Sequence, residues 1–397
     1  MVTQPNPSAS ARNHRLLNRI PGMLRLLTGL MVGWFLLGWP TPAHATAKGL
    51  LVSSNPVTDP KALLRLALPV EDPHIRQIES SLEDMRYQLR LKRWRAMEAD
   101  LKIAQRTLDQ HQQDILDQVA LEHRPAATTH LNAISTGLTD LAALIARRDK
   151  PAVLAAQDAL LDHVGALEAL MVREFPFSIP EEYAHLPQLL GRATVKIVTN
   201  KGDLIVVLDG YNAPITAGNF LDLVQQGFYN HLPFTRAEQS YVVQAGDPPG
   251  DADGYVDPRT GRIRRIPLEI RVQGDKQPLY GTTLEAAGRY LEKPVLPFAA
   301  YGTLAMARDE FDPNSASSQF FFLLFEPELT PAGVNLLDGR YAVFGYLVDG
   351  KSVLEKIRAG DEIERMEILD GAEHLVNATP LPAKQALLEW STLNPQF

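Results

Sequence analysis

Two hydrophobic periods divide the chain into a helical half and a β-rich half. Over residues 73–175, apolar residues recur three and four positions apart, which marks one face of each of four successive α-helices. Asp72 before Pro73, and Asp149 before Lys150 and Pro151, are typical helix starts. Because short connections favour antiparallel neighbours, the pattern predicts an up-and-down four-helix bundle over residues 73–175.

The period changes to two after Ala193. Alternating apolar residues on both sides of residues 199–203 predict a β-hairpin, and several further short apolar runs are separated by turn residues. Only two helical patterns interrupt them, at residues 214–226 and 351–358. Many short strands with few helices predict a closed antiparallel eight-stranded β-barrel with capping helices, so the fold class is multidomain α + β.

The N-terminus has the pattern of a secretory signal peptide. Four arginines precede an apolar run at residues 26–39, and Ala43-His44-Ala45 follows as a cleavage signal. An uncleaved membrane anchor is the alternative. The predicted segments are a signal peptide (1–45), a segment that packs on the body (46–72), the helical bundle (73–175), a proline-rich linker (176–190), the β-domain (191–370) and a tail with a short helix (371–397).

Composition excludes several classes of function. The formal net charge is −8, and residues 1–45 carry four arginines and no acid, so cleavage would leave −8 − 4 = −12. Such an acidic chain is not a typical nucleic-acid-binding protein. It has no cysteine, which excludes disulfides, thiol nucleophiles and cysteine metal sites. The histidines between residues 74 and 163 show no consistent metal-ligand spacing.

One stretch, residues 234–247, combines an arginine with a short apolar strand. Arg236 precedes the strand-like residues 241–244, and Gly246-Asp247 ends them. Arg236 and Gln244 can therefore stand over one apolar face, where an arginine can hold a peptide group. An isolated arginine beside aromatic residues is otherwise an ordinary surface residue.

Three blocks, at residues 234–247, 304–321 and 337–345, resemble those of the cyclophilin family in order, and in spacing apart from an insertion between the first two. The resemblance implies an eight-stranded barrel that isomerises X-Pro peptide bonds without metal or cofactor. It assigns catalysis to Arg236, which donates to the proline nitrogen, and to Gln244, which orients substrate and arginine. It assigns substrate binding to Tyr241, Val242, Ala307, Arg308, Gln319, Phe321, Leu337 and Tyr341.

The resemblance extends to the N-terminal half. Residues 55–69, 175–183, 208–214 and 267–270 resemble the multidomain cyclophilins of the thylakoid lumen. This implies an exported protein of the thylakoid lumen, with the periplasm as alternative. It also implies X-Pro segments of proteins as substrates, a role in photosystem II assembly or maintenance, photosystem II subunits as partners, and no stable membrane span after signal cleavage.

Five positions depart from the common pattern of the family. Tyr241 replaces a phenylalanine, Val242 a methionine, Arg308 an asparagine, Tyr341 a histidine and Leu336 a tryptophan. These changes bear on catalytic efficiency more than on proline binding. The alternative function is therefore a largely non-catalytic assembly chaperone that uses the pocket and the bundle to hold partner proteins.

Overall fold

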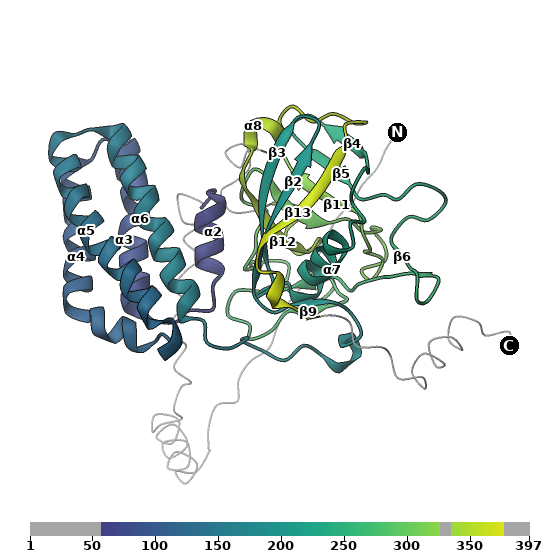
Figure 1. The fold of residues 1–397 in the computed structure, drawn as a ribbon, viewed down its shortest axis with the longest axis horizontal. Coiled ribbons are helices and arrows are strands. Elements are labelled where there is room, and N and C mark those ends of the chain that lie inside the picture. The colour runs from purple at the N-terminus through teal and green to yellow at the C-terminus, as the bar shows by residue number, and fades with distance from the viewer. Residues whose placement is uncertain (1–56, 326–334, 377–397) are drawn as a thin grey trace, which may run out of the picture. The chain divides into compact units, whose positions relative to one another are not determined.

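The computed structural model describes residues 57–325 and 335–376 (Figure 1). The predicted signal peptide and the predicted helix of the tail lie outside these residues. The described residues contain seven α-helices, of which four form the bundle, and an eight-stranded sheet. None of the helices within the described ranges is long and apolar enough to cross a membrane.

The bundle consists of four helices that share one apolar core. They are α3 (Pro73–Arg90), α4 (Trp94–Asp117), α5 (Arg124–Arg147) and α6 (Lys150–Met171), and a 3₁₀ turn (Leu121–His123) precedes α5. The carboxylates of Asp72 and Asp149 cap α3 and α6 by accepting backbone N–H bonds, as the sequence predicts. The apolar residues that define the helical period, such as Ile78 and Leu82, are fully buried.

Polar contacts between α3 and α6 establish that these two helices are antiparallel. Arg86, in the last third of α3, pairs with Asp158 in the first half of α6. Arg76, near the start of α3, pairs with Glu168 near the end of α6. The helices of the bundle lie side by side in Figure 1.

Helix α2 (Pro60–Ala67) has two different faces. Leu63, Leu64 and Ala67 belong to the apolar core of the β-domain. The carbonyl of Leu64 accepts a bond from Arg192, and the carbonyl of Ala67 accepts one from Asn212 at 2.9 Å. One face of this short helix is therefore part of the β-domain.

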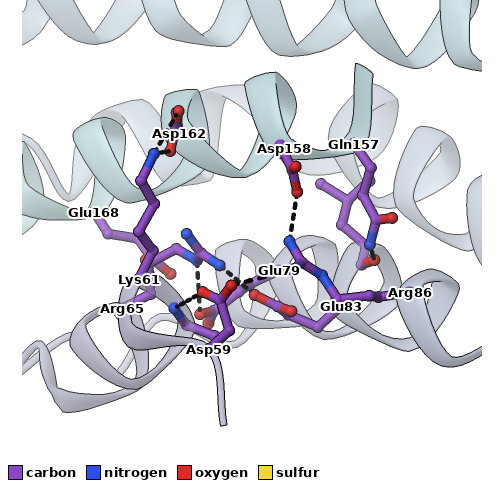
Figure 2. Close-up of polar contacts among 12 residues, drawn as sticks. Asp59, Lys61, Arg65, Glu79, Glu83, Arg86, Gln157, Asp158, Asp162 and Glu168 are labelled. Atoms are coloured by element: carbon purple, nitrogen blue, oxygen red, sulfur yellow. Dashed lines mark hydrogen bonds and ion pairs between the residues drawn. The ribbon is translucent and has the colours of Figure 1, made fainter. Parts of the chain in front are cut away.

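The other face of α2 carries charged residues that contact α3 and α6 (Figure 2). Arg65 is only 5% exposed and pairs with Glu83, and its Nε lies 3.7 Å from Glu79. Lys61 pairs with Asp162 at 2.9 Å, but this pair is exposed. From α3, Arg76 donates to the carbonyls of Arg65 and Leu68, so the C-terminal end of α2 is held by a side chain of the bundle.

The β-domain is built on one antiparallel sheet. Its order is β13-β2-β3-β12-β10-β11-β5-β4. The strands are β2 (Arg192–Thr199), β3 (Gly202–Asp209), β4 (Phe234–Glu238), β5 (Val242–Ala245), β10 (Thr303–Met306), β11 (Phe320–Leu323), β12 (Val343–Asp349) and β13 (Ile363–Asp370). Smaller two-stranded sheets pair β1 (Gln188–Leu189) with β14 (Leu375–Val376), β6 (Val256–Asp257) with β7 (Arg262–Ile263), and β8 (Glu269–Ile270) with β9 (Leu279–Tyr280).

Helix α7 (Pro214–Gln225) supplies much of the contact with the sheet, whereas α8 (Lys351–Leu354) is a single turn, shorter than predicted. Phe220 of α7 packs edge-on against Phe320 of β11, with ring centroids 5.1 Å apart, and also contacts Phe344. Phe320 and Phe322 are fully buried on this face of the sheet. Phe321, which lies between them, therefore points to the opposite face.

The prediction of a closed barrel is wrong in one respect, because the sheet is curled but open. Its edge strands, β4 and β13, do not form a continuous ladder. They are joined by an isolated bridge between Pro233 and Glu362 and by single backbone bonds such as His231 N–H to the carbonyl of Ile363 at 2.7 Å. Backbone bonds lie on both sides of the bridge, from Ile363 N–H to the carbonyl of Leu232 at 3.0 Å and from Phe234 N–H to the carbonyl of Asp361 at 2.8 Å, so the contact between the two edges is confined to a few residues.

Candidate active site

Strand register brings the central predicted residues into one row. Arg236 of β4 is paired with Gln244 of β5, and Gln244 is paired with Phe321 of β11. Residues directly opposite each other in neighbouring strands point to the same face of a sheet. Arg236, Gln244 and Phe321 therefore share the face opposite the α7 side.

The end of β5 approaches residues 318–319 closely because it contains a glycine. Gly246 has a φ of +93°, and a Cβ there would lie 2.4 Å from the carbonyl oxygen of Ser318. The Ser318 hydroxyl also donates to the carbonyl of Gly246 at 2.8 Å. This contact places Gln319 beside Gln244.

The two glutamine side chains form an ordered chain of hydrogen bonds. Gln244 Nε2 donates to Gln319 Oε1 at 2.9 Å. Gln319 Nε2 donates in turn to Asp247 Oδ1 at 3.1 Å and to the carbonyl of Asp253 at 3.0 Å. The amide oxygen of Gln244 has no donor among the described residues, so it can accept a bond from a substrate or from Arg236.

Arg236 is held at the edge of the site by a residue that the sequence analysis missed. Its Nε and Nη2 atoms both lie 2.7 Å from Glu238 Oε1, and its guanidinium lies 5.7 Å from the centre of the Tyr241 ring. Arg236 and Glu238 are two positions apart on a strand, so the period of two could have revealed their shared face. Their side chains are about half exposed. Such a pair is worth about 1 kcal/mol or less, so a bound peptide can compete for the arginine.

An aromatic cluster surrounds Phe321. Its ring is nearly parallel to that of Phe298, with centroids 6.0 Å apart, and it meets Tyr341 edge-on at 5.6 Å. The guanidinium of Arg308 lies 5.0 Å from the centre of the Tyr341 ring. Phe298, which is 4% exposed, was not predicted as a site residue because it lies outside the three sequence blocks.

Asp338 anchors the loop that carries Leu337 and Tyr341. Its carboxylate accepts bonds from the backbone N–H of Phe298 at 2.8 Å and of Asn335 at 3.3 Å. Burial raises the pKa of Asp338 to about 6, although these two bonds oppose the shift. Leu337 is half-buried beside the core.

Two predicted substrate-binding residues, Val242 and Tyr241, lie on β5 and just before it. Val242 is 4% exposed and lies two positions before Gln244, so it shares that residue's face of the strand. Tyr241 is 42% exposed and is covered on one side by Arg236. The apolar surface that these residues form with Phe321 is therefore buried at Val242 and Phe321 and exposed at Tyr241.

An open pocket of about 420 Å³ lies beside the glutamines. Four predicted residues line it: Gln244, Ala307, Arg308 and Gln319. It is polar, because it is also lined by Asp253, Arg265, Asp309, Asp312, Ser315 and Ser317. Of the predicted residues, Arg236, Tyr241, Val242, Phe321, Leu337 and Tyr341 do not line it.

Comparisons with protein families match both halves of the chain. Residues 194–372 match the model described as cyclophilin type peptidyl-prolyl cis-trans isomerase/CLD. Residues 59–172 match the model described as peptidyl-prolyl cis-trans isomerase CYP38-like, PsbQ-like domain.

Individual relatives are similar over most of their length. A putative thylakoid lumen peptidyl-prolyl cis-trans isomerase of Synechocystis sp. is 51% identical, over 89% of this chain and 93% of the relative. The chloroplastic peptidyl-prolyl cis-trans isomerase CYP38 of Arabidopsis thaliana is 43% identical, over 89% of this chain and 85% of the relative. The chloroplastic CYP37 of the same plant is 32% identical, over 79% and 69%.

Proposed function

The chain belongs to the cyclophilin family of peptidyl-prolyl cis-trans isomerases, and we propose that Arg236 and Gln244 are the catalytic pair with which it isomerises X-Pro bonds. The observation that carries this proposal is the row across three strands, in which Arg236, Gln244 and Phe321 are paired in turn. It places a cationic donor, an amide and an aromatic wall on one face.

The chemistry requires a donor rather than a nucleophile. The barrier to rotation about an X-Pro bond is about 20 kcal/mol, and it arises from amide resonance. In the twisted transition state the proline nitrogen becomes a better acceptor, so a hydrogen bond to it lowers the barrier. Arg236 stays protonated throughout and can make this bond once a substrate draws it away from Glu238.

Gln244 orients the substrate in this mechanism. Its amide group is fixed because Nε2 is bound to Gln319, and this leaves the amide oxygen available on the side of Arg236. The proline ring packs on Val242, Phe321, Leu337, Tyr241 and Tyr341. The polar pocket at Ala307, Arg308 and Gln319 takes the chain next to the proline.

We further propose that the protein acts in the thylakoid lumen on segments of photosystem II subunits or assembly intermediates. The names of two relatives, one of the thylakoid lumen and one chloroplastic, support the location. The photosystem II role rests on the resemblance to multidomain lumenal cyclophilins. Fractionation that finds the mature protein in the periplasm would contradict the location.

A largely non-catalytic assembly chaperone is the second candidate. Two observations favour it: Arg236 is engaged by Glu238, and Tyr341 and Leu336 depart from the common pattern of the family. Such a protein would bind X-Pro segments in the same pocket without accelerating their exchange.

The test is NMR exchange spectroscopy on an X-Pro peptide with wild-type protein and Arg236→Ala. We expect Arg236→Ala to lower the exchange rate by about 10²-fold, as for loss of one transition-state donor. Arg365→Ala is a matched control, because Arg365 forms a similarly exposed pair with Glu367 at 2.6 Å on β13.

The outcomes separate the two candidates. Equal exchange rates for wild type and Arg236→Ala would contradict the catalytic assignment. A wild-type protein that binds the peptide but leaves its exchange at the uncatalysed rate would favour the chaperone. In that case Arg236→Ala should also rescue photosystem II assembly in a deletion strain.

A further inference from the structure

A cluster of metal-ligand side chains lies in the bundle, away from the candidate active site. His74 lies in the first turn of α3, and His111 and Asp114 lie in the last two turns of α4. The imidazole rings are stacked, with centroids 3.7 Å apart and planes inclined by 10°. Asp114 Oδ2 lies 2.8 Å from His111 Nδ1.

These side chains are close enough to share one ion. One ligand atom from each of the three residues lies within 4.8 Å of the other two. Two ligands of a tetrahedral zinc ion, each about 2.0–2.1 Å from the metal, lie roughly 3.3 Å apart. Reaching that spacing requires a shift of up to about 1.5 Å and a rotation of at least one of the stacked rings, so that both nitrogens aim at one ion. This movement is available because the histidines are half-buried and Asp114 is exposed.

We propose that His74, His111 and Asp114 form a binding site for a divalent transition-metal ion, with Zn²⁺ as the reference ion. Two imidazole nitrogens and one carboxylate oxygen suit Zn²⁺ or Cu²⁺, whereas Ca²⁺ and Mg²⁺ prefer oxygen ligands alone. Three protein ligands leave a fourth position of a tetrahedral ion for water.

The cluster joins opposite ends of two helices. Asp114 lies in the last turn of α4, where unpaired carbonyl groups give partial negative charge, whereas His74 lies in the first turn of α3, where the partial charge is positive, so the two helix ends offset each other. Metal binding would link the start of α3 to the end of α4. Because an ion that binds only the folded chain stabilises it, the bundle should become more stable with increasing metal concentration.

A second histidine pair provides an internal comparison. His130 of α5 and His163 of α6 have their Nδ1 atoms 3.1 Å apart, in mutual hydrogen-bond range. Among the described residues, the cluster at His74 is the one group in which three such ligands converge. His130 and His163 therefore lack the third ligand and serve as the control for histidine pairing alone.

The experiment is a calorimetric titration of ZnCl₂ into the full chain, purified without a polyhistidine tag and treated with a chelator. We expect one Zn²⁺ to bind per chain and the melting temperature to rise. His111→Ala should weaken the affinity at least tenfold, as should Asp114→Asn, which keeps the size of the side chain. His130→Ala should bind as wild type does.

Each outcome decides the proposal. Absence of saturable binding to the wild-type protein would overturn it, and so would equal affinities of Asp114→Asn, His111→Ala and wild type. Far-ultraviolet circular dichroism checks that the variants stay helical. If His111→Ala does not fold, Asp114→Asn alone decides, because it removes a ligand from an exposed position.

Discussion

The α2–bundle contact and the candidate active site use arginine in opposite ways. In the contact, Arg65 is 5% exposed and faces Glu79 and Glu83, so its partners are built into the fold. In the β-domain, the side chain of Arg236 is 47% exposed and pairs with Glu238 on its own strand. A buried arginine cannot leave its partners without a large cost, whereas an exposed one can exchange them for a ligand.

The strongest test of this comparison is Arg65→Ala. Removal of the guanidinium leaves Glu79 and Glu83 without that partner in a buried setting, and we expect the free energy of unfolding to fall by about 3–5 kcal/mol. Urea denaturation followed by circular dichroism measures this. The control is Lys61→Ala, whose exposed pair with Asp162 is worth about 1 kcal/mol or less. If the two variants lose similar amounts of unfolding free energy, burial does not make the ion pairs of Arg65 more stabilising than the exposed pair of Lys61.

The next test uses the pH dependence of stability at Glu168, which is fully buried. Burial, together with repulsion from Glu79, raises the pKa of Glu168 to about 8, although Arg76 opposes the shift. The folded chain therefore holds this proton more tightly than the unfolded chain, where the pKa is about 4.3. The proton on Glu168 therefore contributes its full stabilisation of the folded chain below the unfolded pKa, and this contribution is lost as the pH rises through about 8.

Glu168→Gln, which stays neutral, should flatten the fall in melting temperature between pH 7 and pH 9. We expect the wild type to lose on the order of 2–4 °C more than the variant across this range. Asp338 shifts in the same direction but titrates at about 6, below the window. An identical slope for both proteins in differential scanning calorimetry would contradict the assignment.

For Arg236 of the candidate active site we expect a small effect on stability. Arg236→Ala removes an exposed pair, so the free energy of unfolding should change by less than about 1 kcal/mol, while the rate of prolyl exchange falls about 10²-fold. The same urea denaturation as for Arg65→Ala measures it. If the free energy of unfolding falls by about 3 kcal/mol or more, Arg236 stabilises the fold as Arg65 does, and the difference between the two arginines disappears.

The smallest predicted effect concerns Glu238, the ion-pair partner of Arg236. Glu238→Gln weakens the ion pair with Arg236 and should raise the rate of prolyl exchange by about two- to fivefold. This factor corresponds to the free energy of an exposed ion pair. Glu367→Gln, in the corresponding pair on β13, is the control. A fall in the exchange rate on Glu238→Gln would show instead that Glu238 positions the arginine productively.

Much of the arrangement of the candidate residues was predictable because it follows from local pattern. Arg236 and Gln244 lie on strands joined by a short turn, so their pairing depends on few residues. Glu238 could have been added from the period of two. Phe298 and Asp338 could not, because their contacts with Phe321 and with the loop at Leu337 join segments far apart in the chain.

By itself, the amino-acid sequence determined the four bundle helices, the caps at Asp72 and Asp149, and the three blocks of the β-domain. These features depend on neighbours within a few turns or one hairpin, where backbone geometry fixes the period. Only the tertiary structure decided that β4 and β13 stay unpaired edges of the sheet, that α2 packs on both the β-domain and the bundle, and that His74 meets His111. Such contacts depend on how distant segments pack, and a local period carries no information about that.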